Sequence, residues 1–269
     1  MTEIAPTASV DKTAQLGRDV FIGPGCVVAP GVVIGDNCVL KANVIIGTGV
    51  TMGSENIMFP NCVLGEEPQI IGEHDPQTEL IIGTGNVFRE NVTINRGSPI
   101  GAGKTIIGNG CYFMTGSHVG HDCDIEDKVV IGNYSQVGGH GKVERNVWMS
   151  SFCGAHQFVT IGRFTYVGGL SGMTHDIPPF MRVASSYPCK VRGLNIVGLQ
   201  RAGFSDDSIR ALEQACRRLY IRRQGPLTTI VEEMTSQDGL DENVKYLLES
   251  LQRSFQHRLG RYRELFRHD

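Results

Sequence analysis

Four of the eight histidines gather in the middle of the chain, and they are the clearest sign of chemistry in the sequence. Asp122 follows one of them directly, and Gln157 follows another. The group comprises His118, His121 with Asp122, His140, and His156 with Gln157. Imidazole titrates near neutral pH, so it suits removal of a proton from a hydroxyl group. An adjacent carboxylate could fix the tautomer of such a base.

The same residue types also allow two other uses. Three histidines with an open position would suit zinc, and polar side chains at an edge can simply pair with backbone groups or a neighbouring subunit. The alignment of four histidines favours chemistry over the purely structural use. Spacing does not decide between a base and a metal site, although the chain has neither an HExxH motif nor a paired cysteine motif to support metal.

The element that positions these histidines is a repeat with a period of six. Every sixth residue from Ile4 to Leu64 is apolar, and the pattern resumes from Ile82 to Ile94 and from Ile107 to Met173. A hexapeptide repeat is typical of a parallel β-helix, in which three short strands form one coil of about 18 residues. Val119, Val137 and Ala155 should therefore stack, which brings the histidines to one edge.

The period is interrupted twice, at residues 65–79 and at residues 97–106, here called the first and second loops. Long loops that project from a compact domain are often functional. Most cysteines fall at the small apolar position of the repeat: Cys26, Cys38, Cys62, Cys111, Cys123 and Cys153. We therefore expect buried, reduced packing residues rather than disulfides or metal ligands.

The pattern changes after Met173, and the sequence becomes helical from Phe204. Ser205 or Asp206, Pro226 and Asp241 fit the starts of three helices. We expect a β-helix domain at residues 1–198 and a small helical domain at residues 199–269.

Composition excludes several classes of protein. A net charge of −3 argues against a general nucleic-acid binder. No apolar run is long enough to span a bilayer, so we expect no stable membrane insertion. The sequence begins without a basic and then apolar stretch, so we expect a cytoplasmic protein.

Several segments, taken in order, resemble the UDP-N-acetylglucosamine O-acyltransferase family, which opens lipid A biosynthesis. They are GSHVGHDC at residues 116–123, GGH at 138–140, AHQF at 155–158, DIPP at 176–179 and NIVGLQRAGF at 195–204. The segment NVTINRG at residues 91–97 and the helical tail extend the match over essentially the whole chain. The resemblance implies a left-handed β-helix assembled as a homotrimer, with active sites between subunits.

The resemblance also implies roles for single residues. The histidine matching His121, assisted by Asp122, takes the proton from the sugar 3-hydroxyl, and the oxygen attacks a 3-hydroxyacyl thioester on acyl carrier protein. The backbone N–H matching Gly139 stabilises the oxyanion, and Gly169 matches the position that limits acyl-chain length. The remaining matches are substrate contacts: Gln69, His118, His140, His156, Gln157, Asn195 and Arg201. No metal or other cofactor is implied, and Arg217, Arg218, Arg222 and Arg223 could steer an acidic carrier protein.

Some positions depart from the family pattern. The first loop has no lysine or arginine, and Val197 and Ala202 replace polar or basic residues that are common there. These changes leave open an N-acyltransferase acting on a 3-amino nucleotide sugar, or another hexapeptide acyltransferase using a coenzyme A thioester. A zinc enzyme of the γ-carbonic-anhydrase type and a non-catalytic scaffold are the remaining alternatives.

Overall fold

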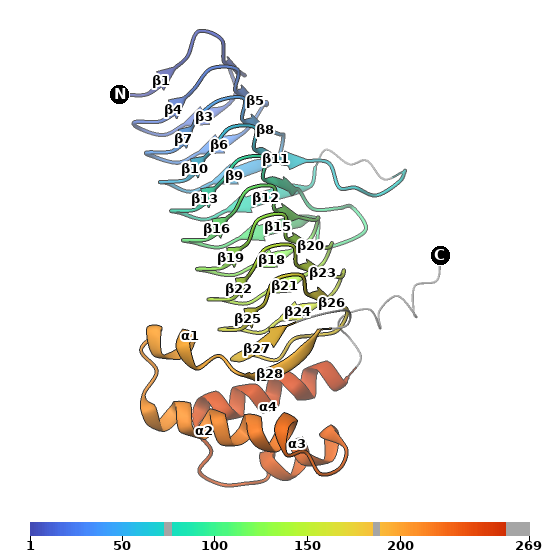
Figure 1. Ribbon diagram of the computed structural model, residues 1–269. Helices are drawn as coiled ribbons and strands as arrows, with labels where there is room; N and C mark the ends of the chain where they lie inside the picture. Colours follow the sequence, from blue (N-terminus) through green and yellow to red (C-terminus); the bar gives the residue numbers. More distant parts are fainter. Residues whose placement is uncertain (73–76, 185–188, 257–269) are drawn as a thin grey trace.

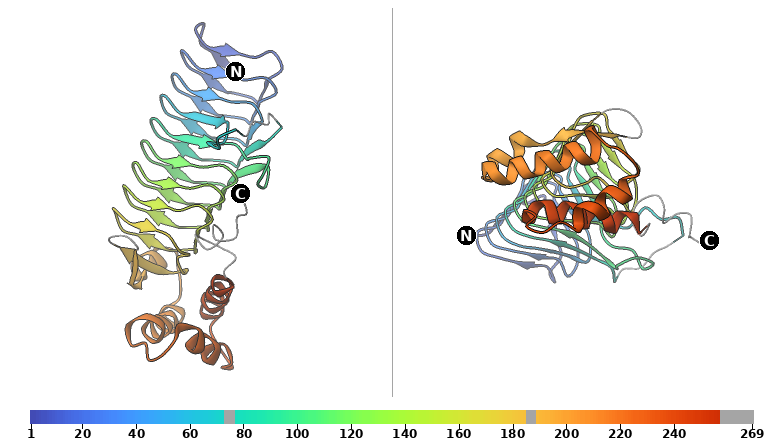
Figure 2. Two further views of the ribbon diagram at one scale, coloured as in Figure 1. Left: turned by 90° about the vertical axis from the view of Figure 1, so that its right-hand side faces the viewer. Right: turned by 90° about the horizontal axis from the view of Figure 1, so that it is seen from below.

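The computed structural model describes residues 1–72, 77–184 and 189–256, and within them the hexapeptide repeats form a left-handed parallel β-helix (Figure 1). Three parallel sheets make the faces of a triangular prism, and each coil adds one strand to each face. The C-terminal helices cover one end of the prism (Figure 2). The predicted fold class is confirmed.

Each sheet gathers strands that lie three apart along the chain, except that β27 and β28 complete sheet A after β25. Sheet A consists of β1 (Glu3–Ile4), β4 (Phe21–Ile22), β7 (Val39–Leu40), β10 (Ile57–Met58), β13 (Val87–Phe88), β16 (Tyr112–Phe113), β19 (Val130–Ile131), β22 (Trp148–Met149), β25 (Tyr166–Val167), β27 (Met181–Ala184) and β28 (Lys190–Leu194). Sheet B consists of β2 (Ser9–Val10), β5 (Val27–Val28), β8 (Ile45–Ile46), β11 (Val63–Glu66), β14 (Thr93–Asn95), β17 (His118–Val119), β20 (Gln136–Val137), β23 (Gly154–Ala155) and β26 (Gly172–Met173). Sheet C consists of β3 (Gln15–Leu16), β6 (Val33–Ile34), β9 (Val50–Met52), β12 (Glu79–Ile82), β15 (Lys104–Ile107), β18 (Asp124–Ile125), β21 (Lys142–Val143) and β24 (Thr160–Ile161).

The large apolar residue of each repeat points into the prism. Ile22, Leu40 and Phe113, for example, are fully buried, and the rings of Phe88 and Phe113 stack 5.0 Å apart. The six cysteines at the small position are also buried and free, as the sequence predicts. Ile4 is an exception because the first coil has no neighbour on its outer side, and it remains 47% exposed. Burial of this continuous apolar column drives the fold.

The C-terminal part starts with a short helix that the sequence did not reveal. This is α1 (Ile196–Arg201), and the expected domain boundary at residue 198 falls inside it. The three expected helices follow as α2 (Asp206–Cys216), α3 (Leu227–Thr235) and α4 (Glu242–Phe255), with Ser205, Pro226 and Asp241 at their N-caps. A π-helical turn, η1 (Arg217–Ile221), extends α2.

The coil does not end cleanly at Met173. β27 continues sheet A parallel to β25, and β28 then pairs antiparallel with β27. The hairpin closes the end of the apolar column where a further coil would otherwise be needed.

Candidate active site

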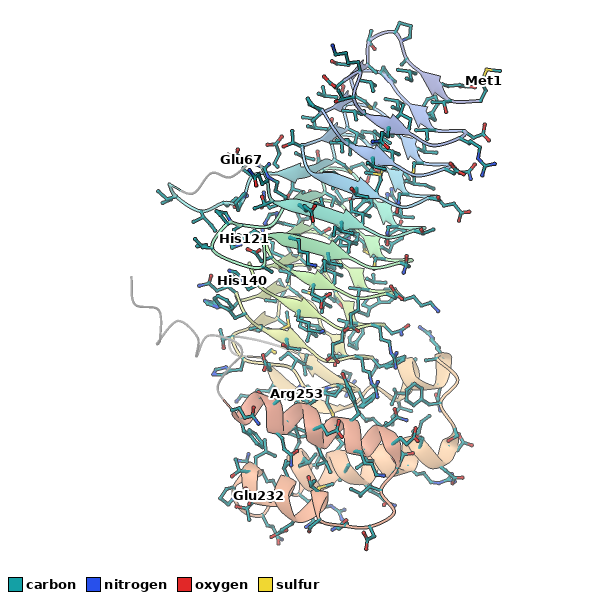
Figure 3. All side chains as sticks on the ribbon, turned by 180° about the vertical axis from the view of Figure 1, so that it is seen from behind. Met1, Glu67, His121, His140, Glu232 and Arg253 are labelled. Atoms are coloured by element: carbon teal, nitrogen blue, oxygen red, sulfur yellow. The ribbon has the colours of Figure 1, made fainter. Side chains whose placement is uncertain are left out.

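The predicted histidine column lies at the corner where sheet B turns into sheet C. Val119 pairs with Val137, and Val137 pairs with Ala155, so the expected stacking is confirmed. His121 follows β17, His140 follows β20, and His156 follows β23 at this corner. Both loops leave the same corner, the first between β11 and β12 and the second between β14 and β15. Figure 3 shows Glu67, His121 and His140 along one edge of the prism.

The second loop is shorter than expected because β15 already begins at Lys104. Residues 73–76 of the first loop lie outside the described residues.

The backbone of this corner brings two neighbouring side chains together. Asp122, His140 and Phe158 occupy equivalent places in successive coils, each with a positive φ, of 58°, 59° and 64° respectively. This left-handed conformation breaks the alternation of a strand. It therefore allows His121 and the adjacent Asp122 to meet. The His140 ring stacks on Phe158 at 4.4 Å, which fixes its plane.

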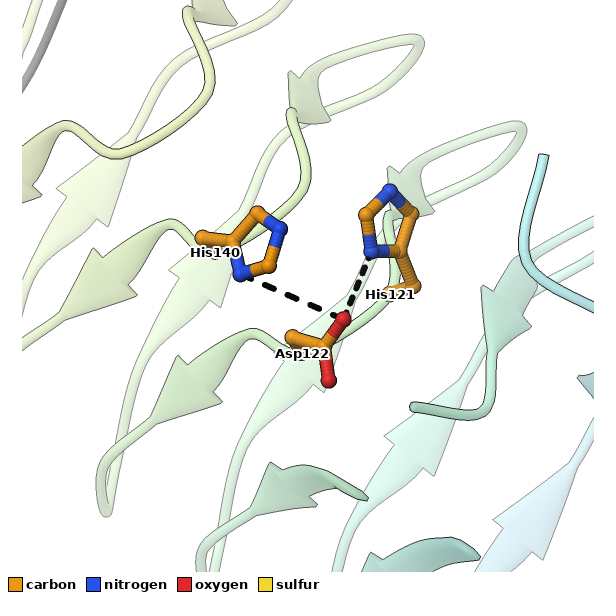
Figure 4. Close-up of side chains that lie close together, drawn as sticks. All are labelled: His121, Asp122 and His140. Atoms are coloured by element: carbon orange, nitrogen blue, oxygen red, sulfur yellow. Dashed lines mark hydrogen bonds and ion pairs between the residues drawn. The ribbon is translucent and has the colours of Figure 1, made fainter. Parts of the chain in front are cut away.

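His121 and Asp122 form a direct hydrogen bond, with 2.8 Å between the imidazole Nδ1 and the carboxylate Oδ2 (Figure 4). Nδ1 of His140 lies 3.9 Å from the same oxygen. The His121 side chain is 12% exposed, whereas that of Asp122 is fully buried. With an ionised Asp122, Nδ1 of His121 donates and Nε2 is left as the acceptor, which is the arrangement of a general base.

Asp122 is kept ionised by its donors. Burial alone would raise its pKa, but the hydrogen bonds from His121 and from the Ser98 hydroxyl and N–H outweigh burial, and the pKa is lowered overall. The Asp122 backbone N–H donates to the Thr105 hydroxyl at 2.8 Å. A carboxylate whose pKa is lowered stays negatively charged above about pH 4.

Two glycines keep space open around the imidazole. A Cβ on Gly139 would lie 2.6 Å from Nε2 of His121, so only glycine fits beneath the ring. A Cβ on Gly120 would lie 2.8 Å from the Gly139 nitrogen. Among the described residues, the Gly139 N–H has no hydrogen-bond acceptor. The corner thus presents a base and a backbone donor beside each other.

His118 lies next to this pair in β17. Its Nδ1 is 2.8 Å from the Thr93 hydroxyl, and burial lowers its pKa, which favours the neutral ring. Nδ1 of His156 lies 3.2 Å from the Gln157 carbonyl oxygen. The corner therefore brings together seven of the predicted site residues: His118, His121, Asp122, Gly139, His140, His156 and Gln157.

Metal binding has one geometric argument in its favour. Ligand atoms of His121, Asp122 and His140 lie within 4.8 Å of one another. However, Oδ2 of Asp122 already accepts from His121 and from the Ser98 hydroxyl, and an ion at that oxygen would have to displace at least one of these donors. The site suits proton transfer better than coordination.

Asn195 and Arg201 lie elsewhere on the chain. They line a pocket of about 820 Å³ between α1 and the outer face of sheet A, which is the face opposite the B–C corner. Its walls include Trp148 and Tyr166, and Lys128 and Arg182 add two further cations. The Asn195 side chain accepts from the Gly198 N–H and donates to the Phe164 carbonyl, so it caps α1.

Val197 and Ala202, which are two of the departures from the family pattern, line the same pocket.

The remaining residues predicted to contact substrate or carrier protein lie outside the B–C corner. Gly169 is exposed in the turn from sheet A to sheet B, and Gln69 is exposed in the first loop. Arg217 and Arg218 are paired with Glu213 and Glu233. Arg222 and Arg223 are exposed just beyond η1. Within one chain, the predicted residues thus form a corner site and separate outlying groups.

Sequence reasoning missed Ser98, Thr105 and Gly120. The break in the hexapeptide period located the second loop, but no periodicity could show that its serine binds Asp122. For Gly120, the only signal was its place directly before His121.

Sequence comparisons agree with the class of protein that this fold and site define, a hexapeptide-repeat transferase. Residues 13–48 and 104–139 match the bacterial transferase hexapeptide family. Residues 176–260 match domain 2 of UDP-N-acetylglucosamine O-acyltransferase.

Relatives are similar over most of the chain. An acyl-(acyl-carrier-protein)–UDP-N-acetylglucosamine O-acyltransferase from Stenotrophomonas maltophilia is 42% identical over 93% of this chain and 94% of its own length. A UDP-N-acetylglucosamine acyltransferase structure from Bacteroides fragilis has a TM-score of 0.90 and 32% identity, covering 96% of this chain and 98% of the other. One from Moraxella catarrhalis has a TM-score of 0.88 and 34% identity, with the same coverage.

The chain belongs to the UDP-N-acetylglucosamine O-acyltransferase family and is an acyltransferase. The family resemblance of the sequence segments is confirmed. None of the helices in the described ranges is both long and apolar enough to cross a membrane.

Proposed function

We propose that this protein transfers a 3-hydroxyacyl group from acyl carrier protein to the 3-hydroxyl of UDP-N-acetylglucosamine, the first step of lipid A biosynthesis, in the cytoplasm. The observation that carries the proposal is the 2.8 Å bond between His121 and the buried Asp122, with Gly139 beneath the ring.

The reaction follows from these groups. Nε2 of His121 takes the proton of the sugar hydroxyl, and the oxygen attacks the thioester carbonyl carbon. The Gly139 N–H donates to the oxyanion of the tetrahedral intermediate, a contribution worth about 3 to 4 kcal/mol for one donor. The intermediate collapses with loss of the phosphopantetheine thiolate, which receives the proton from the His121 imidazolium. Asp122 stabilises that cation while it exists. No metal or other cofactor enters any step.

The pocket between α1 and sheet A suits the nucleotide. Its aromatic walls fit a base, and Lys128, Arg182 and Arg201 fit a diphosphate. Because this pocket and the B–C corner lie on opposite sides of one prism, a single copy cannot offer both to one small substrate. A homotrimer, in which the corner of one copy faces the pocket of the next, would join them.

An apolar ladder next to Gly169 suits the acyl chain. Tyr134, Phe152 and Leu170 occupy equivalent turns of successive coils and are 53%, 58% and 74% exposed. Arg222 and Arg223 provide exposed positive charge for the acidic carrier protein.

A transfer assay tests the proposal. The trimer is given 3-hydroxyacyl carrier proteins of several chain lengths, with UDP-N-acetylglucosamine or its 3-amino analogue, and products are identified by mass. Product with the hydroxyl sugar is expected. Product only with the amine would mean that the acidic first loop has changed the acceptor. No product from a folded trimer would refute the proposal, and metal analysis would follow.

Replacing Gly169 should change the preferred acyl length. A Cβ there would lie 3.3 Å from the Ser151 carbonyl oxygen, so a longer side chain must extend outward along the ladder. We expect Gly169→Met to move the preference to donors shorter by several carbons, with an unchanged KM for the nucleotide sugar. The measurement is kcat/KM across a donor series. An unchanged preference would remove Gly169 from the acyl site.

A further inference from the structure

The second loop closes over the carboxylate of Asp122. The Ser98 N–H lies 3.1 Å from both carboxylate oxygens, and the Ser98 hydroxyl donates to Oδ2, the oxygen that binds His121. A Cβ on Gly101 would lie 2.3 Å from Oδ2, so the loop backbone passes directly over the group. Ser98 and the side chain of Asp122 are both fully buried.

The loop is held rigidly enough to position a side chain. Its two ends are tied to Glu79, which accepts from the Gly97 N–H at 3.0 Å and donates to the Gly103 carbonyl at 2.9 Å. Just before it, the guanidinium of Arg96 is 3% exposed and bonds to the Gly65 carbonyl and the Thr78 hydroxyl. Ser98 is thus fixed by the same strands that carry the first loop.

The donors to Asp122 from this loop are neutral. The titratable groups that face the carboxylate are His121, His140 and the thiol of Cys123, whose pKa is raised to about 12, chiefly by burial. Among the described residues, no lysine or arginine forms an ion pair with Asp122. A neutral donor fixes the orientation of a carboxylate without neutralising it, so Asp122 remains a negative charge beside His121.

We propose that Ser98 is a positioning residue for the transfer reaction: its hydroxyl locks the rotation of the Asp122 carboxylate and thereby holds His121 as a correctly oriented base. The proposal rests on the function proposed above. On this proposal the second loop binds and orients Asp122 and does not contact substrate.

The variant Ser98→Ala tests this idea because it removes the hydroxyl and keeps the backbone N–H. We expect kcat to fall roughly tenfold, as for a loss of base orientation, with KM for both substrates within about twofold of the original. The acidic limb of the plot of kcat/KM against pH should move to higher pH. Without the Ser98 hydroxyl, the Asp122 carboxylate has fewer donors and attracts the proton of His121 more strongly. Asp122→Asn, which removes the charge, should move that limb the opposite way.

Two matched variants separate the hydroxyl from the fold. Ser98→Thr keeps the hydroxyl and should restore kcat. Ser117→Ala removes another fully buried hydroxyl, from the same coil as His121, that has no hydrogen-bond partner among the described residues. It should leave kcat unchanged.

A second measurement tests the role of Ser98 without an assay of acyl transfer. The exchange of the imidazole Cε1 hydrogen of His121 in heavy water, followed by mass spectrometry across pH, gives its titration midpoint in each variant. A higher midpoint in Ser98→Ala is expected, with His175 as an exposed internal reference. An unchanged midpoint and kcat in Ser98→Ala, or a Ser98→Thr variant as impaired as Ser98→Ala, would overturn the inference. If the original protein shows no transfer, the proposed function fails, and the midpoints still decide the role of Ser98.

Discussion

His121→Ala should abolish acyl transfer while the β-helix stays folded. A positioned base typically accelerates proton transfer by about 10² to 10⁴-fold, and this chain places one imidazole nitrogen against a buried carboxylate so that the other is free to act. We expect kcat to fall by about 10³-fold or more, with only a small change in KM. Single-turnover measurement with a saturating 3-hydroxyacyl carrier protein gives the chemical step directly.

The fold should tolerate the loss of the His121 ring because the ring lies outside the apolar column. Its neighbours in the corner are Asp122 and His140. The backbone carbonyl of residue 121 accepts from the His140 N–H, and the alanine variant keeps this bond. The control is His175→Ala, which removes an exposed imidazole bonded to Thr174 at the end of the prism. Full activity in His175→Ala, together with an unchanged mass of the assembly for both variants, isolates the base. Substantial transfer by His121→Ala would make the corner a structural feature and favour a scaffold.

The prism and the histidine column could be predicted because both follow from one period. Once each coil takes about 18 residues, residues such as Val119 and Val137 must stack, and side chains in equivalent turns must share a corner. The helix starts were also readable, since Ser205 and Asp241 cap helices through local contacts that sequence spacing records.

The contacts that complete the site were not predictable in the same way. The bond between His121 and Asp122 requires a positive φ at Asp122, a conformation that the hexapeptide pattern does not specify. Ser98 reaches the carboxylate from a loop where the period is absent. Such contacts depend on the path of an irregular backbone, which no periodicity encodes.

The predicted site residues are divided between two sides of one chain. The family resemblance implies that Arg201 and His121 serve active sites between subunits, and within one chain the two residues lie on opposite sides of the prism. The sequence segments alone do not show whether two residues meet within a chain or across copies of it. The mutual distance of these groups is therefore the strongest structural support for the proposed trimer.

Gly139→Ala should be almost as damaging as removal of the base, although it adds only one methyl group. The new Cβ would lie 2.6 Å from Nε2 and 2.7 Å from Cε1 of His121, far inside van der Waals contact. The ring must then move away from the sugar hydroxyl, or the Gly139 backbone must shift and carry its N–H away from the oxyanion. Either movement misplaces a reacting group, and loss of a single oxyanion donor alone costs about 10² to 10³-fold in kcat. We expect a loss of at least that size.

The matched control is Gly154→Ala in β23, a neighbouring strand of sheet B. A Cβ at Gly154 meets no atom within 4 Å, and its backbone has no positive φ, so the same chemical change adds no clash. We expect Gly154→Ala to keep kcat within about twofold, as substitutions without a buried contact usually do. Thermal unfolding of both variants checks that the coils stay intact. If Gly139→Ala retained the activity of Gly154→Ala, the imidazole would not act from above Gly139, and neither the base nor the oxyanion donor could be assigned to this corner.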